Sequence, residues 1–131
     1  MRVVLLLCML LAVRIICGQT GGEMNQQAHV SYQRADKELN AVYQKIVVNY
    51  KNDPAFIASL KAAQRLWIQF RDAELKMKYP QREQGYYGTV YPMCYSAYKE
   101  ELTRQRIKTL QQWLEGAEEG DVCAGSVKLK Q

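Results

Sequence analysis

The segment that decides the fold is residues 54–79, PAFIASLKAAQRLWIQFRDAELKMKY. Positions suited to packing recur in it at steps of three or four residues, the spacing of one face of an α-helix. They are Phe56, Leu60, Ala63, Trp67, Phe70, Glu74 and Met77. Asp53 is suited to cap the N-terminus of this helix, and Pro54 to occupy its first position. Tyr79 precedes Pro80, which disfavours further helix. The pattern predicts one helix from Pro54 to about Tyr79.

The same spacing occurs before this segment, and apolar residues with a less regular helical periodicity follow it. From about Glu23 to Tyr50 the stripe is Ala28, Tyr32, Ala35, Leu39, Val42, Ile46 and Tyr50. From Tyr91 to about Glu115 it is Tyr95, Tyr98, Leu102, Ile107, Leu110, Trp113 and Leu114. Residues 81–90 contain two glycines and no periodicity, so we expect a loop there. The sequence predicts an all-α, up-down-up antiparallel bundle of three long helices with an irregular C-terminal tail.

The N-terminus has the pattern of an export signal. A basic Arg2 precedes the uninterrupted apolar run VVLLLCMLLAV at 3–13, which is too short to span a membrane as a helix. We expect residues 1–18 to be a signal peptide, cleaved before Gln19 or nearby within 16–20, and residues 19–131 to be one helical domain in the periplasm or secreted. A lipoprotein acylated at Cys17 and an uncleaved N-terminal anchor are the alternatives.

Removal of the signal changes the charge and the cysteine content. The full chain of 131 residues has 18 Lys and Arg against 13 Asp and Glu, and loss of Arg2 and Arg14 reduces its net charge from +5 to +3. This modest charge, without a dense basic stripe, argues against nucleic acid as a partner. Of four cysteines, Cys94 and Cys123 remain. Two thiols in an exported chain predict a disulfide between them.

Several charged residues fall where helices should pack. Arg71 and Glu74 share one face of the central segment, and we expect them to form a structural ion network with Glu101 and Arg106 of the last helix. A catalytic role for Glu74 on wall sugars is the weaker alternative. The chain has a single histidine, His29, expected on the surface, and no motif for catalysis or metal binding. We therefore expect neither an enzyme nor a cofactor.

Tyrosines are concentrated near the second loop. Six of the nine lie between Tyr79 and Tyr98. Tyrosine is enriched at protein interfaces because it combines a large contact area with a polar tip. Tyr86, Tyr87 and Tyr91 are candidate partner-binding residues, although these rings could equally cover an open end of the bundle. An acidic group in the tail is a second candidate surface: Glu115, Glu118, Glu119 and Asp121.

Five segments resemble the small exported bacterial proteins with the LprI-like lysozyme-inhibitor domain. They are EMNQ (23–26), ADKELNAVYQKI (35–46), LKAAQRLWIQFRDAE (60–74), YGTVYPMCY (87–95) and ELTRQRIKTL (101–110). The resemblance implies a helical domain, export and, for the named member of the family, inhibition of lysozyme. Gln27, Leu75 and Tyr98 stand where typical members have cysteines, so this chain lacks the usual crosslinks.

The predicted function is that of an exported, non-enzymatic binding protein with a protein partner, and inhibition of lysozyme would protect the cell wall. A structural or envelope-maintenance module without an enzyme target is the alternative. A positive net charge does not steer the chain toward a basic lysozyme over long range, so the acidic tail would have to act locally.

Overall fold

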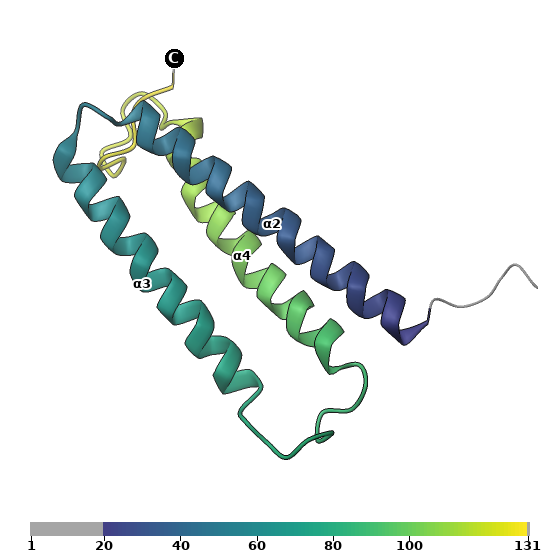
Figure 1. The fold of residues 1–131 in the computed structure, drawn as a ribbon. Helices are drawn as coiled ribbons and strands as arrows, with labels where there is room; N and C mark the ends of the chain where they lie inside the picture. Colours follow the sequence, from purple (N-terminus) through teal and green to yellow (C-terminus); the bar gives the residue numbers. More distant parts are fainter. Residues whose placement is uncertain (1–19, 131) are drawn as a thin grey trace, which may run out of the picture.

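A computed structural model describes residues 20–130 of the chain. These residues form three α-helices, labelled α2 (Gly21–Asn49), α3 (Pro54–Lys78) and α4 (Tyr91–Glu115), which confirms the all-α class (Figure 1). Each boundary lies within two residues of the predicted one. Within residues 20–130 the sole β-type pairing is an isolated bridge between Ala117 and Leu129. The expected signal peptide and its cleavage site lie outside the described residues, apart from Thr20.

The three helices do not pack equally. Helices α2 and α4 lie side by side in close contact, whereas α3 contacts α4 more sparsely and stands apart from α2 along much of its length (Figure 1). Contacts between α3 and α4 join Gln64 to Arg106 and Glu74 to Tyr98. Because one residue number rises as the other falls, α3 and α4 run in opposite directions.

Local sequence sets where each helix begins and ends. Thr20 and Glu23 form a capping box, in which the Thr20 hydroxyl accepts from the Glu23 backbone N–H at 3.2 Å. The Asp53 carboxylate accepts from the backbone N–H of Phe56 at 2.9 Å and caps α3. Helix α4 ends at Gly116, whose φ of 80° is readily adopted only by glycine.

The core is concentrated toward the end of the bundle where α2 and α4 finish. It contains Leu39, Val42 and Ile46 from α2, Tyr50 from its C-cap, Leu60 from α3, and Ile107 and Leu110 from α4. Phe56 packs on this core, with its ring 4.4 Å from that of Tyr50 and 6.1 Å from that of Trp113, measured between centroids. Aromatic contacts thus attach the start of α3 to the ends of the other two helices.

The buried face of α3 differs from the predicted one. Leu60, Arg71 and Leu75 are buried, whereas Phe70 and Met77 of the predicted stripe are exposed. The apolar arc of α3 is wider than one contact face, and sparse packing against α4 covers only one side of it. Periodicity identified the helix correctly and part of its buried face, since Phe56, Leu60 and Trp67 of the predicted stripe lie in or against the core. It was wrong for Phe70 and Met77.

Candidate partner-binding surfaces at the two ends of the bundle

Asn25 joins the beginnings of α2 and α4. Helix α4 has no side-chain cap of its own at Val90. Instead, the Asn25 side-chain oxygen accepts from the backbone N–H of Met93 at 3.1 Å, and its amide nitrogen donates to the carbonyl of Thr89 at 3.4 Å. Asn25 therefore satisfies a first-turn donor of a helix 68 residues further along the chain. Sequence reasoning missed this role, because capping from another helix leaves no local pattern.

The predicted ion network is wrong in its partners. The carboxylate of Glu74 is half-buried and accepts from the hydroxyl of Tyr98 at 3.1 Å, not from an arginine. Arg106 donates to the side-chain oxygen of Gln64 at 3.0 Å. Glu101 lies on the exposed side of α4 and accepts from Gln105. The faces of α3 and α4 do meet, but the bonds between them link a charged group to a neutral one.

Two arginines, one from α3 and one from α4, approach the ring of Trp67. The guanidinium carbon of Arg71 lies 5.3 Å from the ring centroid of Trp67, and that of Arg106 lies 5.9 Å from it, within cation–π range. Arg71 is buried and pairs with Asp72 at 3.0 Å and, across to α2, with Asp36 at 3.8 Å. Burial lowers the pKa of Arg106. The QRLWIQFRDAE segment therefore connects α3 to both other helices.

A cluster of tyrosine rings lies where α3 ends and α4 begins. The Tyr79 ring is 5.6 Å from that of Tyr87 and 5.4 Å from that of Tyr91, and Tyr87 and Tyr91 are stacked at 5.2 Å. Tyr86 meets Tyr87 edge-on at 5.0 Å, and Tyr95 extends the cluster along α4. The structure thus brings together the three tyrosines predicted as candidate binding residues.

The tyrosine cluster combines a fixed base with an exposed rim. The Tyr87 hydroxyl donates to the carbonyl of Pro80 at 2.7 Å, and burial raises the pKa of Tyr79. Tyr86, in contrast, is 64% exposed, and the Arg82 guanidinium lies 5.8 Å from its ring centroid. Gly85 and Gly88, with φ of 85° and 74°, allow the tight turns of this loop. An open hollow of about 270 Å³ lies among these residues.

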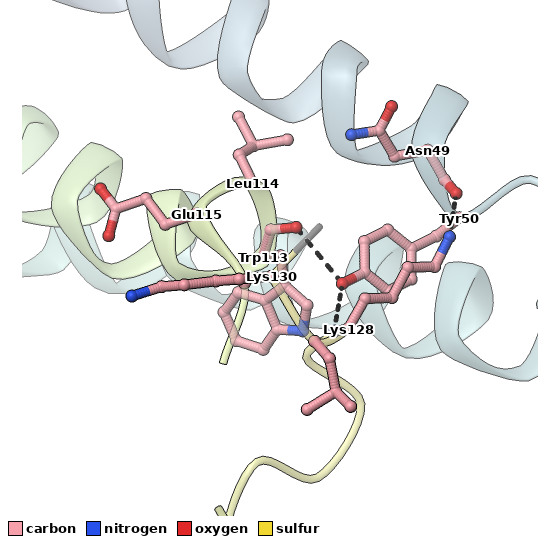
Figure 2. Close-up of a pocket in the computed structure, with 9 residues that line it drawn as sticks. Asn49, Tyr50, Trp113, Leu114, Glu115, Lys128 and Lys130 are labelled. Carbon is pink, nitrogen blue, oxygen red and sulfur yellow. Dashed lines mark hydrogen bonds between the residues drawn. The ribbon is translucent and has the colours of Figure 1, made fainter. Parts of the chain in front are cut away.

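The other end of the bundle holds the C-terminal tail, which folds back onto the last turns of α2 and α4. The Tyr50 hydroxyl donates to the carbonyl of Trp113 at 3.2 Å and accepts from the backbone N–H of Lys128 at 3.0 Å (Figure 2). Lys128 also donates to the last carbonyl of α2, at Asn49, at 2.6 Å. Trp113 donates to Ser126 at 3.0 Å. The irregular tail is therefore anchored, and a hollow of about 630 Å³ lies between it and the helix ends.

The acidic group at this end is less negative than the sequence suggested. Glu115, Glu118, Glu119 and Asp121 are all exposed. However, Glu118 pairs with Lys130, which raises the pKa of Lys130, and Asp121 accepts from the backbone of Cys123. The tail returns Lys130 to the neighbourhood of Glu118 and Glu115, which reduces the negative electrostatic potential that a basic partner would meet.

The predicted disulfide is wrong. Within residues 20–130 Cys94 and Cys123 are both free. Cys94 lies in the first turn of α4, whereas Cys123 lies in the tail beyond its last turn, so about 30 Å of helix separates the two ends. A disulfide requires Cα atoms within about 7 Å. The same distance places the tyrosine cluster and the acidic tail at opposite ends, so they do not form one continuous surface.

No group of His, Cys, Asp and Glu in the described part of the chain is arranged to hold a metal ion. His29 is exposed on α2, as expected. Within residues 20–130, none of the helices combines the length and apolar character that crossing a membrane requires.

These features define a small all-α protein whose polar motif residues are engaged in joining helices and whose tyrosines gather at one exposed end. The chain belongs to the family described as Lysozyme inhibitor LprI, whose sequence profile it matches over residues 17–110. It is also 32% identical over 107 residues to an uncharacterized protein of Rhizobium meliloti (strain 1021), covering 73% of this chain and 75% of the relative. No solved structure gives a significant match.

Proposed function

We propose that this protein is exported and inhibits a lysozyme by binding it through the tyrosine cluster. Membership of the LprI family supports a protein partner of this kind. The observation that carries the proposal is the contact of five tyrosine rings, from the end of α3, the loop and the first turns of α4, with Tyr86 at the exposed rim. Loops on a rigid scaffold are the usual place for recognition, and rigid aromatic rings lose little entropy on binding.

Export is supported by the N-terminal sequence. Arg2 and the apolar run at 3–13 have the composition of a signal peptide, and lysozyme acts outside the cytoplasm. We infer cleavage near Gln19 and a mature domain that starts just before the capping box of α2. Cleavage at this point would leave the capping box of Thr20 and Glu23 intact.

Binding, rather than catalysis, is the mode that the side chains favour. Glu74 is the carboxylate that acid–base chemistry would require, but it accepts a hydrogen bond from Tyr98 within the contact between α3 and α4. Gln64, Trp67 and Arg71 of the same motif also contact neighbouring helices. These residues have structural partners, which leaves the exposed loop as the better candidate for function.

The test is the rate at which lysozymes of several types clear cell-wall suspensions in the presence of the purified protein. Tyr86→Ala should weaken inhibition at least about tenfold, because truncation of a tyrosine that anchors an interface costs about 2 kcal/mol or more. It should leave the melting temperature unchanged, since Tyr86 is exposed. A tail variant, Glu115→Gln with Glu119→Gln, serves as the control for the opposite end and should inhibit normally.

Two results would contradict the proposal in different ways. Equal inhibition by wild type and Tyr86→Ala, with loss in the tail variant, would move the binding surface to the acidic end. No inhibition of any lysozyme type at large molar excess would remove lysozyme as the partner and favour an envelope-maintenance module.

A further inference from the structure

Helix α3 carries an apolar stripe that its own bundle leaves uncovered. The stripe consists of Ala63, Leu66, Phe70, Ala73 and Met77, at alternating steps of three and four residues. All five are exposed, and the three large side chains are 65%, 57% and 69% exposed at Leu66, Phe70 and Met77. This spacing is that of the a and d positions of a coiled coil over two heptads.

The stripe lies on the side of α3 that faces away from its buried residues. On a helical wheel its centre is about 100–160° from the buried positions Leu60, Arg71 and Leu75, given 100° per residue. The charged residues Lys61, Arg65 and Asp72 occupy the remaining arc. The stripe presents roughly 400 Å² of apolar surface, within the 300–600 Å² range of the largest patches on monomeric proteins, which often have a binding role.

We propose that a second copy of this chain covers the stripe, through antiparallel pairing of α3 about a two-fold axis beside Arg71 and Asp72. In antiparallel coiled-coil packing a positions meet d positions of the partner helix. With this axis, Phe70 of one copy faces Ala73 of the other, and Leu66 faces Met77. The largest side chain of the stripe thus meets a small one, and each contact occurs twice, as an isologous interface requires.

The surroundings of the stripe fit this arrangement. Gln69 and Lys76 border it on the solvent side and would face each other across the axis, so no like charges are opposed. Ser59 and Pro80 close the stripe at its two ends. A patch of this size buries less than the roughly 800 Å² per partner of a standard interface, so the dimer should be weak and reversible.

Sedimentation velocity of the exported protein, from about 1 µM to about 1 mM, tests the proposal. The wild type should shift from monomer to dimer within this range. The Phe70→Glu variant should remain monomeric, because it places a charge in the apolar contact. Its self-association should be at least about tenfold weaker than that of the wild type. Ala73→Glu should act alike, whereas Ala58→Glu, an equally exposed alanine on the charged arc of the same helix, should dimerise as wild type does. Circular dichroism checks that each variant is folded.

Spin labels separate antiparallel from parallel pairing. In a background with Cys94→Ser and Cys123→Ser, a label at position 69 should give a short interprotomer distance, and one at position 61 a distance longer by about 20 Å, from 1.5 Å rise per residue. Short distances at both positions, a monomer throughout the concentration range, or a dimer that Phe70→Glu leaves intact would each overturn the proposal. If the wild type stays monomeric and Phe70→Glu abolishes lysozyme inhibition, the stripe is the binding surface for lysozyme instead.

Discussion

The phenolic hydroxyl of Tyr98 donates a hydrogen bond to the carboxylate of Glu74 over 3.1 Å, and this bond joins α4 to α3. Leu75, the neighbour of Glu74 in α3, is buried. The hydrogen bond from Tyr98 therefore connects the two helices beside a buried apolar residue of α3.

The Tyr98–Glu74 hydrogen bond predicts that the free energy of unfolding falls at alkaline pH. Burial, followed by the hydrogen bond and charge of Glu74, raises the pKa of Tyr98 above its ordinary 10.0. A raised pKa means that the folded state favours the neutral phenol. This contribution to stability is complete below pH 10 and is lost as the pH rises through the folded-state pKa. Tyrosinate absorbance should show two late-titrating groups, Tyr79 and Tyr98, of which one disappears in Tyr98→Phe.

Glu74→Gln provides the control for this titration. The amide oxygen of glutamine can still accept from Tyr98, but its charge is gone, so the Tyr98 pKa should fall toward the ordinary value while the helix contact persists. An unchanged titration in both variants would show that the bond is not formed in solution.

Removal of the Asn25 side chain should loosen the start of α4. Asn25→Ala leaves the Met93 N–H without its acceptor, and loss of a helix cap costs about 1 kcal/mol of unfolding free energy. Asn25→Asp keeps the acceptor and adds a negative charge at a helix N-terminus, so it should retain most of the stability. Urea unfolding measures both. Equal stability of wild type and Asn25→Ala would contradict capping from α2.

Gly116 should control whether the tail docks. A Cβ at this position would lie 3.0 Å from the carbonyl oxygen of Lys128 and 3.0 Å from the backbone nitrogen of Lys130. Gly116→Ala should therefore release the tail, which limited proteolysis would detect as faster cleavage within residues 117–130. Gly120→Ala is the matched control, because its φ is also positive but nothing lies within 4 Å of its Cβ. Both variants carry backbone strain, so the difference between them isolates the close contact.

Both thiols of the exported domain should react with an alkylating agent under non-reducing conditions. Exposed Cys123 should react faster than half-buried Cys94, because access limits the second thiol. Intact mass spectrometry should show two adducts. A mass without adducts before reduction, and with two afterwards, would mean that the cysteines are paired despite their separation along α4.

Local sequence determined the helices and their ends. Asp53 and Pro80 act through the few residues beside them, so the capping of α3 and its termination could be read from the chain alone. The exposed loop tyrosines were also found from sequence, because their clustering between two helices is local. The contact among their rings follows from the tight loop that joins Tyr79 to Tyr91.

Tertiary structure alone decided which residues meet. The sequence of α3 allows either of two overlapping faces to be buried. Only the tertiary structure placed Arg71 and Leu75 inside and Phe70 and Met77 outside. The partners of Glu74, Arg106 and Asn25 lie on other helices, and many pairings satisfy the same periodicity. Cys94 and Cys123 are separated by the length of α4, and the number of cysteines in the sequence gives no information about this distance. Short-range hydrogen bonds fix a helix, but long-range packing fixes its rotation and its neighbours, and that information is distributed over the whole chain.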